Sequence, residues 1–313
     1  MNVTTFAKCL SDPTRARLAN LLLRFELNVG EIVQVMAMGQ SRISRHLKIL
    51  TDGGILTQRK DGLWVFYRCS DPQTIGGRFI ACLHPFFEQD EQMRDDLHRA
   101  ARIIEERTTD TKRFFDSIAP KWSRLSQEVL GDFDLAGEIA SAMPACTTAV
   151  DLGCGTGEFL PILRQRADQV IGVDNSPRML AQAEKRLTGL DGISLRIGEL
   201  SHLPLRDQEA DAGLLSLVLH HLTDPRAVIQ EISRVLRPGG TFVVIDFVNH
   251  HNEMMRKRFG DRWLGFDPAE LETWLETEGF TCAPPRLHPV NHGLSIFLIN
   301  AHNTKEHEHD NGS

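Results

Sequence analysis

Two acids that flank a glycine-rich loop are the residues of this chain whose spacing most clearly predicts chemistry. Asp151 ends a short apolar run, the loop Gly-Cys-Gly-Thr-Gly follows at 153–157, and a second apolar run ends at Asp174. Glycine lacks a Cβ, so a ligand can approach the backbone of such a loop closely. This order predicts a strand, a tight turn, a helix and a second strand whose terminal carboxylate can hold a ribose.

The charges around the loop distinguish two kinds of cofactor. The dinucleotide spacing G-x-G-x-x-G, started at Gly153, would need a glycine where Glu158 stands. Glu158 and Asp151 together would repel a pyrophosphate at the helix N-terminus. Two acids suit a positively charged cofactor instead, and S-adenosylmethionine (SAM) carries a sulfonium and an ammonium group. A dinucleotide domain or a non-binding relic is the alternative.

These residues resemble the cofactor loop of class I SAM-dependent methyltransferases, most closely the branch around the ubiquinone and menaquinone biosynthesis methyltransferases. The segments that carry the resemblance are 151–157, Asp174, 198–200, 203–205 and 235–241, within roughly residues 115–300. The resemblance implies SAM as cofactor and a Rossmann-like, seven-stranded α/β sheet. The cofactor-binding residues that it implies are Asp151, Gly153, Cys154, Gly155, Thr156, Gly157, Asp174, Asn175, Met179, Glu199, Leu200 and Ser216.

Two histidines and one acid are candidates for catalysis. His220 and His221 follow the apolar run 214–219, and Asp246 follows 242–245, so all three are expected at the carboxyl edge of neighbouring strands. Methyl transfer needs a general base only where the acceptor must first lose a proton, and histidine can serve. The alternatives are that one histidine only packs against SAM and that Asp246 is structural. The charged segment 250–266 is predicted to hold a polar or anionic acceptor, or to be a solvated helix.

The distribution of charge indicates a second function. The chain has 313 residues, enough for two domains, and a net charge of −7. Residues 1–80 carry eleven Lys/Arg and six Asp/Glu, so the excess of acid lies in the remainder. A basic region joined to an acidic one is typical of nucleic-acid binding. The sequence shows no membrane span and no signal peptide, and its six cysteines have no paired spacing, so we expect a cytoplasmic protein.

The basic region predicts a winged helix-turn-helix. Helices are expected to begin at Asp12-Pro13, at Asn28 and near Gln40, and a hairpin is expected around Asp61-Gly62. In the third helix, Ile43, Leu47 and Leu50 form an apolar stripe. The residues predicted to contact DNA, on the opposite face and in the hairpin, are Ser41, Arg42, Ser44, Arg45, Lys48 and Lys60.

Residues 44–50 and 53–56 resemble the arsenic-repressor (ArsR/SmtB) family of dimeric winged-helix repressors, over roughly residues 3–95. The resemblance implies a homodimer that binds operator DNA. Metalloid-sensing members carry paired cysteines near the second helix, where this chain has none at 26–31, so we predict no metal site and no response to arsenite. Cys82 and His84 are interpreted as a buried thiol and a surface imidazole.

The predicted organisation is a winged-helix domain over 1–84, a linking and dimerisation helix over 85–118, a methyltransferase domain over 119–302 and a disordered tail over 303–313. The predicted function is a DNA-binding transcriptional regulator whose methyltransferase domain methylates a small molecule. Two alternatives stay open. One is a repressor that senses SAM or S-adenosylhomocysteine without turnover, and the other is a methyltransferase whose winged helix serves only dimerisation.

Overall fold

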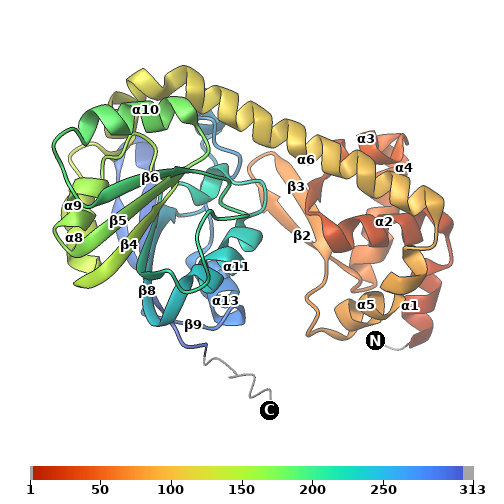
Figure 1. Ribbon diagram of the computed structural model, residues 1–313. Helices are drawn as coiled ribbons and strands as arrows, with labels where there is room; N and C mark the ends of the chain where they lie inside the picture. The colour runs from red at the N-terminus through yellow and green to blue at the C-terminus, as the bar shows by residue number, and fades with distance from the viewer. Residues whose placement is uncertain (1–2, 306–313) are drawn as a thin grey trace, which may run out of the picture. The chain divides into compact units, whose positions relative to one another are not determined.

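The computed structural model of the chain describes residues 3–305 and divides after Thr108 into two compact units (Figure 1). Each unit has its own hydrophobic core. The division lies inside one helix, α6 (Glu91–Ile118), which is shared by both units. None of the helices in residues 3–305 combines the length and the apolar character needed to cross a bilayer.

The N-terminal unit is built from helices that bury one apolar face each. Its elements are α1 (Val3–Leu10), α2 (Pro13–Arg24), β1 (Leu27–Asn28), α3 (Val29–Met36), α4 (Gln40–Asp52), β2 (Leu56–Asp61), β3 (Trp64–Cys69) and α5 (Ile75–Phe87). The Asp12 carboxylate caps α2 by accepting the backbone N–H of Thr14 at 2.8 Å. Asn28 and Glu31 form a capping box at the start of α3. These caps confirm the helix starts expected from the sequence.

The wing is a three-stranded antiparallel sheet in the order β1-β3-β2. Strands β2 and β3 pair from Leu56 with Cys69 to Asp61 with Trp64, so the hairpin turns at Gly62 and Leu63. Gly62 has φ of 56°, a conformation that glycine adopts without steric cost. The winged helix-turn-helix expected from the sequence is confirmed.

The single helix expected over 85–118 is interrupted near its start in the structure. Helix α5 continues to Phe87, and α6 begins only at Glu91. The side chain of Asp90 accepts the backbone N–H of Met93 at 3.0 Å and so caps the start of α6. The chain therefore turns between the two helices, and the polar residues around position 89 belong to that turn.

The C-terminal unit is an α/β fold around a mostly parallel sheet. Its strands lie in the order β10-β11-β8-β7-β4-β5-β6. The remaining strand, β9, lies off this path and pairs with β11. Strands β4 to β8 pair in parallel, whereas β9, β10 and β11 are antiparallel. The strands are β4 (Cys146–Leu152), β5 (Ala167–Asp174), β6 (Ile193–Ile197), β7 (Ala210–Ser216), β8 (Leu236–Phe247), β9 (Phe280–Cys282), β10 (Arg286–Pro289) and β11 (Ser295–Asn303).

Helices cover both faces of this sheet, with α8 to α10 on one side and α11 and α13 on the other (Figure 1). The helices of this unit after α6 are α7 (Trp122–Leu130), α8 (Leu135–Ala142), α9 (Leu160–Arg164), α10 (Pro177–Arg186), α11 (Pro225–Val235), α12 (Met254–Phe259) and α13 (Pro268–Thr277). The Rossmann-like expectation is confirmed. The expected seven strands form one path, and the three-residue strand β9 adds an eighth.

The strand order reverses at β4, whose neighbours are β5 on one side and β7 on the other. In open α/β sheets, ligands bind at the carboxyl ends of the strands where the order reverses. The glycine loop leaves the carboxyl end of β4, so the topology brings it to this position.

The tail begins later than expected from the sequence. Asn303 lies in β11, is 2% exposed, and its side-chain amide donates to the carbonyl oxygens of Ser233 and Leu236. These hydrogen bonds and the pairing with Phe280 fix Asn303 in the sheet. The remainder of the expected tail, residues 306–313, lies outside the described residues.

Candidate functional site

The glycine loop turns sharply at the carboxyl end of β4. Gly153 has φ of 75°, and a Cβ there would lie 2.7 Å from a methyl group of Val218, so no larger residue fits. Gly155 has φ of 52°, and the only described atom near the place of its Cβ is Nε1 of Trp122, at 3.8 Å. Backbone freedom and open space at Gly155 let a ligand approach the loop.

Asp174, the last residue of β5, is anchored against the glycine loop. One oxygen of Asp174 accepts the backbone N–H of Gly155 at 2.9 Å, and the other accepts that of Ser176 at 2.8 Å. Ser176 in turn donates its hydroxyl to Asp116, the third residue from the end of α6, at 2.6 Å. The Asp174 carboxylate is thus held rigidly at the end of β5, where its remaining lone pairs can accept hydroxyl groups.

Three buried polar atoms around the loop have no hydrogen-bond partner among the described residues. They are Oδ2 of Asp151, Oγ1 of Thr156 and Oγ of Ser216. Their residues are 2%, 3% and 9% exposed, and Ser216 ends β7, directly beside β4. Unpartnered buried polar atoms cost free energy, so their convergence at a strand-order reversal indicates a ligand site. All three residues are among those predicted to bind the cofactor.

Burial and neighbouring negative charges shift the pKa values of the two acids. Burial raises the pKa of Asp151 to about 7, and the nearby Asp174 charge adds to the effect. Burial also raises the pKa of Asp174, although the N–H groups of Ser176 and Gly155 oppose the shift. Two acids this close retain their charge more easily when a cation binds between them. The sulfonium and ammonium groups of SAM fit this requirement.

The other predicted cofactor residues divide into two groups. Asn175 and Glu199 join the loops after β5 and β6, since the Asn175 amide donates to the Glu199 carboxylate at 3.1 Å. Leu200 and Met179 are buried beside them, at 8% and 2% exposure.

Cys154 and Gly157 face the protein core. Cys154 belongs to the core cluster, and its sulfur would lie 2.9 Å from a Cβ at Gly172 on β5. Burial raises the pKa of the Cys154 thiol strongly. At Gly157, a Cβ would lie 3.0 Å from the Cβ of Ala183 on α10, so this glycine lets α10 pack closely. Only the backbone of these two residues is available to a ligand.

The two predicted catalytic histidines lie on a short 3-10 turn, η2 (Leu219–His221), after β7. The ring of His220 donates from Nδ1 to the Asp246 carboxylate at 2.7 Å, because a carboxylate can only accept. The ring of His221 likewise donates from Nδ1 to the carbonyl of Gly260 at 3.2 Å. The structure therefore brings His220, His221 and Asp246 together at one edge of the sheet.

The two histidines have opposite pKa shifts. Burial lowers the pKa of His220, but the carboxylates of Asp246 and Asp261 outweigh burial, and the net pKa is raised. Burial lowers the pKa of His221 well below its usual value, and the charge of His220 adds to this effect. His221 is therefore neutral near pH 7, with its Nδ1 protonated and a lone pair on Nε2.

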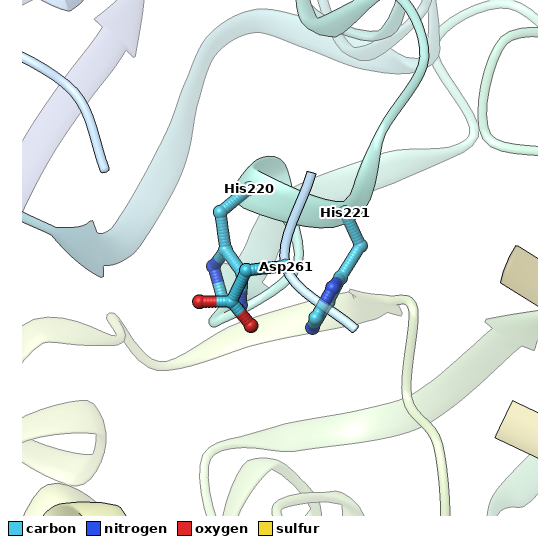
Figure 2. A group of neighbouring side chains, drawn as sticks. All are labelled: His220, His221 and Asp261. Atoms are coloured by element: carbon cyan, nitrogen blue, oxygen red, sulfur yellow. The ribbon is translucent and has the colours of Figure 1, made fainter. Parts of the chain in front are cut away.

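The site also contains two residues outside the predicted catalytic set. Asp261 is 4% exposed and lies 3.7 Å from Nε2 of His220, measured to its Oδ1 (Figure 2). Phe115, on α6, packs edge-on against the ring of His221 at a centroid distance of 4.7 Å, and its ring also contacts Trp122. Asp261 belongs to the segment 250–266 that is expected to hold an acceptor, but no local motif places it or Phe115 beside the two histidines.

The segment expected to hold an acceptor is largely buried. Trp263, Leu264 and Phe266 are each at most 1% exposed, and the Trp263 indole donates to the Leu222 carbonyl at 2.7 Å. Within it, α12 spans Met254–Phe259 and buries Met255 and Phe259. The alternative of a solvated helix is therefore wrong for this segment.

The recognition helix α4 separates apolar from polar residues as expected. Ile43, Leu47 and Leu50 are fully buried. The predicted DNA-binding residues are all exposed, namely Ser41, Arg42, Ser44, Arg45, Lys48 and, on β2, Lys60. The basic face is thus accessible, whereas His46 on the same helix is buried and has its pKa lowered by burial.

One expectation for α5 is wrong. Cys82 is exposed rather than buried, because it lies on the outer face of the helix. His84 is partly buried, and its ring contacts the Arg24 guanidinium and lies 3.4 Å from Glu88.

Comparison with known proteins supports both halves of the chain. The family described as "Bacterial regulatory protein, arsR family" matches residues 12–58, and the family described as "Methyltransferase domain" matches residues 150–244. A 2-phytyl-1,4-naphtoquinone methyltransferase from Nostoc is 31% identical over 160 residues, which cover 48% of this chain and 69% of the relative.

Two further comparisons set the limits of this similarity. An uncharacterized 37.1 kDa protein in transposon TN4556 of Streptomyces fradiae is 34% identical over 164 residues, 49% of this chain but only 45% of that protein. The putative methyltransferase solved in complex with the Haloferax volcanii Trm112 methyltransferase activator has a TM-score of 0.52 and 22% identity. That likeness covers 61% of this chain and 98% of the solved one, and shows the fold alone.

The chain belongs to the SAM-dependent methyltransferase family that includes the quinone methyltransferases, and its N-terminal unit carries an arsR-family helix-turn-helix. SAM is the cofactor that this family membership indicates.

Proposed function

We propose that this protein is a DNA-binding transcriptional regulator whose second unit binds SAM and methylates a small molecule. The observation that carries the proposal is the convergence of unpartnered Asp151, Thr156 and Ser216 oxygens beside the anchored Asp174 carboxylate. Buried polar atoms without a partner cost free energy, so a ligand that supplies their hydrogen bonds is favoured at this position.

In the proposed complex, Asp174 accepts hydrogen bonds from the two ribose hydroxyls. Asp151 faces the cationic part of SAM, because its carboxylate is buried and one of its oxygens has no hydrogen-bond partner among the described residues. Asn175, Glu199 and Leu200 flank the adenine. The chain's own role in methyl transfer is to hold donor and acceptor in line and to exclude water.

The catalytic roles of the histidine pair follow from their contacts. Asp246 fixes the ring of His220, and Gly260 fixes the ring of His221, so Nε2 of each ring is left out of these bonds, and the two ring centroids lie 3.9 Å apart. An acceptor that must lose a proton before methylation would meet these nitrogens first. His220, His221 and Asp246 are therefore the proposed catalytic side chains.

The proposed DNA contacts come from the exposed face of α4 and from Lys60 in the wing. A helix of this kind enters the major groove, where arginine reads guanine and lysine neutralises phosphate. A homodimer on a two-fold symmetric operator is the expected arrangement.

A second candidate is a repressor that senses SAM or S-adenosylhomocysteine without turnover. One observation favours it. Helix α6 begins in the N-terminal unit, and its last turns supply Phe115 and Asp116, which contact His221 and Ser176 beside the cofactor loop. A regulator that responds to cofactor occupancy would need such a contact.

The test uses SAM labelled in its methyl group with tritium. The protein is incubated with labelled SAM and a small-molecule extract of the cells in which it occurs, and transfer of the label is measured. In parallel, isothermal titration measures the binding of SAM and of S-adenosylhomocysteine. Label transfer that disappears in Asp174→Ala supports the enzyme. Tight binding of both compounds without transfer supports the sensor. Absence of binding would overturn both.

A further inference from the structure

Two histidines and one aspartate in the C-terminal unit have the composition of a metal site. His220, His221 and Asp261 are each less than 9% exposed, and one ligand atom from each lies within 4.8 Å of the others. Figure 2 shows both histidine rings projecting from one turn, with the Asp261 carboxylate beside the His220 ring. Asp261 comes from the loop after α12, forty residues along the chain.

The hydrogen bonds at Nδ1 leave both Nε2 atoms as ligands. His220 donates from Nδ1 to Asp246, and His221 donates from Nδ1 to the Gly260 carbonyl. When neutral, each ring therefore carries its lone pair on Nε2. Metal-binding histidines are oriented in this manner, by a carboxylate or a backbone carbonyl at the other nitrogen.

The Nε2 atom of His221 has no other partner among the described residues, although it is fully buried. This is an independent observation that points to a ligand, because a buried lone pair without a partner is unfavourable. The Nε2 atom of His221 is therefore available to a ligand.

The distances fit a shared cation better than a hydrogen bond. Nε2 of His220 and Oδ1 of Asp261 are 3.7 Å apart, which exceeds hydrogen-bond length. Metal–ligand bonds of about 2.1 Å that meet at about 124° would place two ligand atoms at this separation. The three ligand atoms lie within 4.8 Å of one another, so a pair at that limit would have to approach by roughly 1 Å when a metal binds.

We infer that His220, His221 and Asp261 bind a divalent first-row transition metal, with Asp246 orienting His220 from behind. Two imidazoles and one carboxylate suit Zn²⁺ or Fe²⁺ better than Mg²⁺ or Ca²⁺, which prefer oxygen ligands. Three protein ligands leave coordination positions open, as in catalytic metal sites.

The inference goes beyond the proposed function and does not depend on it. The site lies next to the cofactor loop, since a Cβ built on Gly153 would lie 2.7 Å from the side chain of Val218, which lies between β7 and the histidines. An oxygen of the methyl acceptor can bind the open position, where the metal lowers the pKa of that oxygen. With the metal bound, the histidines act as ligands rather than as bases. The acceptor oxygen then loses its proton because the metal lowers the pKa of that oxygen.

The experiment measures metal binding itself, so it does not require an active enzyme. The full-length protein is dialysed against Zn²⁺, and the bound metal is measured by plasma mass spectrometry. Wild type should hold one equivalent per chain. His221→Ala and Asp261→Asn should lose it, and Asp246→Asn should weaken binding by about 10–100-fold, the usual effect of removing an outer partner.

Two controls keep the result interpretable. The double variant His307→Ala with His309→Ala removes the only two histidines beyond the described residues and should keep the metal. Circular dichroism and the thermal unfolding transition of each variant report whether it is folded, without any need for SAM binding. If the ligand variants fail to fold, pulsed electron paramagnetic resonance of Cu²⁺ bound to the tail variant counts the coordinated imidazoles, and two are expected.

The inference is overturned if wild type binds no metal, or if the metal is lost in the tail variant but kept in folded His221→Ala. Fewer than two imidazoles on Cu²⁺ would also overturn it. Loss of the metal site would leave SAM and DNA binding unchanged, so its failure is distinguishable from failure of the proposed function.

Discussion

The charge on Asp151 is expected to make SAM binding depend on pH. Its carboxyl is buried and has a pKa of about 7, mainly because of burial. A bound cation favours the ionised form, so SAM binding releases a proton whenever Asp151 is protonated beforehand. Well below this pKa the affinity should fall about tenfold for each pH unit. Between about pH 8 and about pH 6, the dissociation constant should rise roughly tenfold.

The raised pKa of Asp151 should also affect the stability of the cofactor-free protein: SAM affinity should rise with pH, whereas the free energy of unfolding should fall. Because the pKa of the Asp151 carboxyl is raised from its ordinary 3.8 to about 7, the folded protein is more stable when this carboxyl is protonated. That contribution is complete below about pH 4 and is lost as pH rises to about 7, and amounts to roughly 4 kcal/mol. Asp151→Asn should therefore raise the melting temperature at pH 8 while weakening SAM binding.

Isothermal titration of SAM at three pH values, in buffers of different ionisation enthalpy, measures both the affinity and the released proton. Asp168→Asn removes an exposed acid from β5 and serves as the matched control. The reasoning is refuted if Asp151→Asn keeps the pH dependence of wild type, or if wild type binds SAM equally well at all three values.

Three further predictions follow from the two units. Asp174→Ala should weaken SAM binding by about 2–4 kcal/mol because the ribose loses its acceptor; an unchanged affinity in titration would exclude this role. Arg42→Ala and Arg45→Ala should each cost about 1–3 kcal/mol on a specific operator and relax the sequence specificity, as measured by fluorescence anisotropy; equal binding would remove α4 from the interface. Asp116→Ala breaks the contact with Ser176 and should reduce any effect of SAM on operator affinity. Couplings of about 1–3 kcal/mol between two ligand sites are typical. If wild type binds the operator equally well with SAM, with S-adenosylhomocysteine and with neither, no coupling exists.

Local patterns were sufficient to predict the strand ends that carry Asp151 and Asp174. In both cases an apolar run, the acid and the following turn are contiguous, so strand period and turn chemistry define the position. Helical periodicity was likewise sufficient to predict the buried apolar stripe of α4. The assignment of individual residues to cofactor, acceptor and DNA stays a prediction, because it depends on ligands.

The contacts that could not be predicted join residues far apart in sequence. Asp261 approaches His220 only because the backbone N–H groups of Arg262 and Trp263 both donate to the His220 carbonyl, at 2.9 Å each. Asn303 was placed in a tail because its segment is polar, yet its amide satisfies two buried carbonyls. Such pairings arise from tertiary hydrogen bonds, which leave no period in the sequence.

The burial of Cys154 has a practical consequence for work with thiol reagents. The thiolate is the reactive form of cysteine, and burial with a strongly raised pKa makes Cys154 inert although it lies in the cofactor loop. Cys82 is exposed on α5. A maleimide fluorophore should therefore label the N-terminal unit at Cys82 and leave the SAM site unmodified, and mild oxidants should likewise spare the loop.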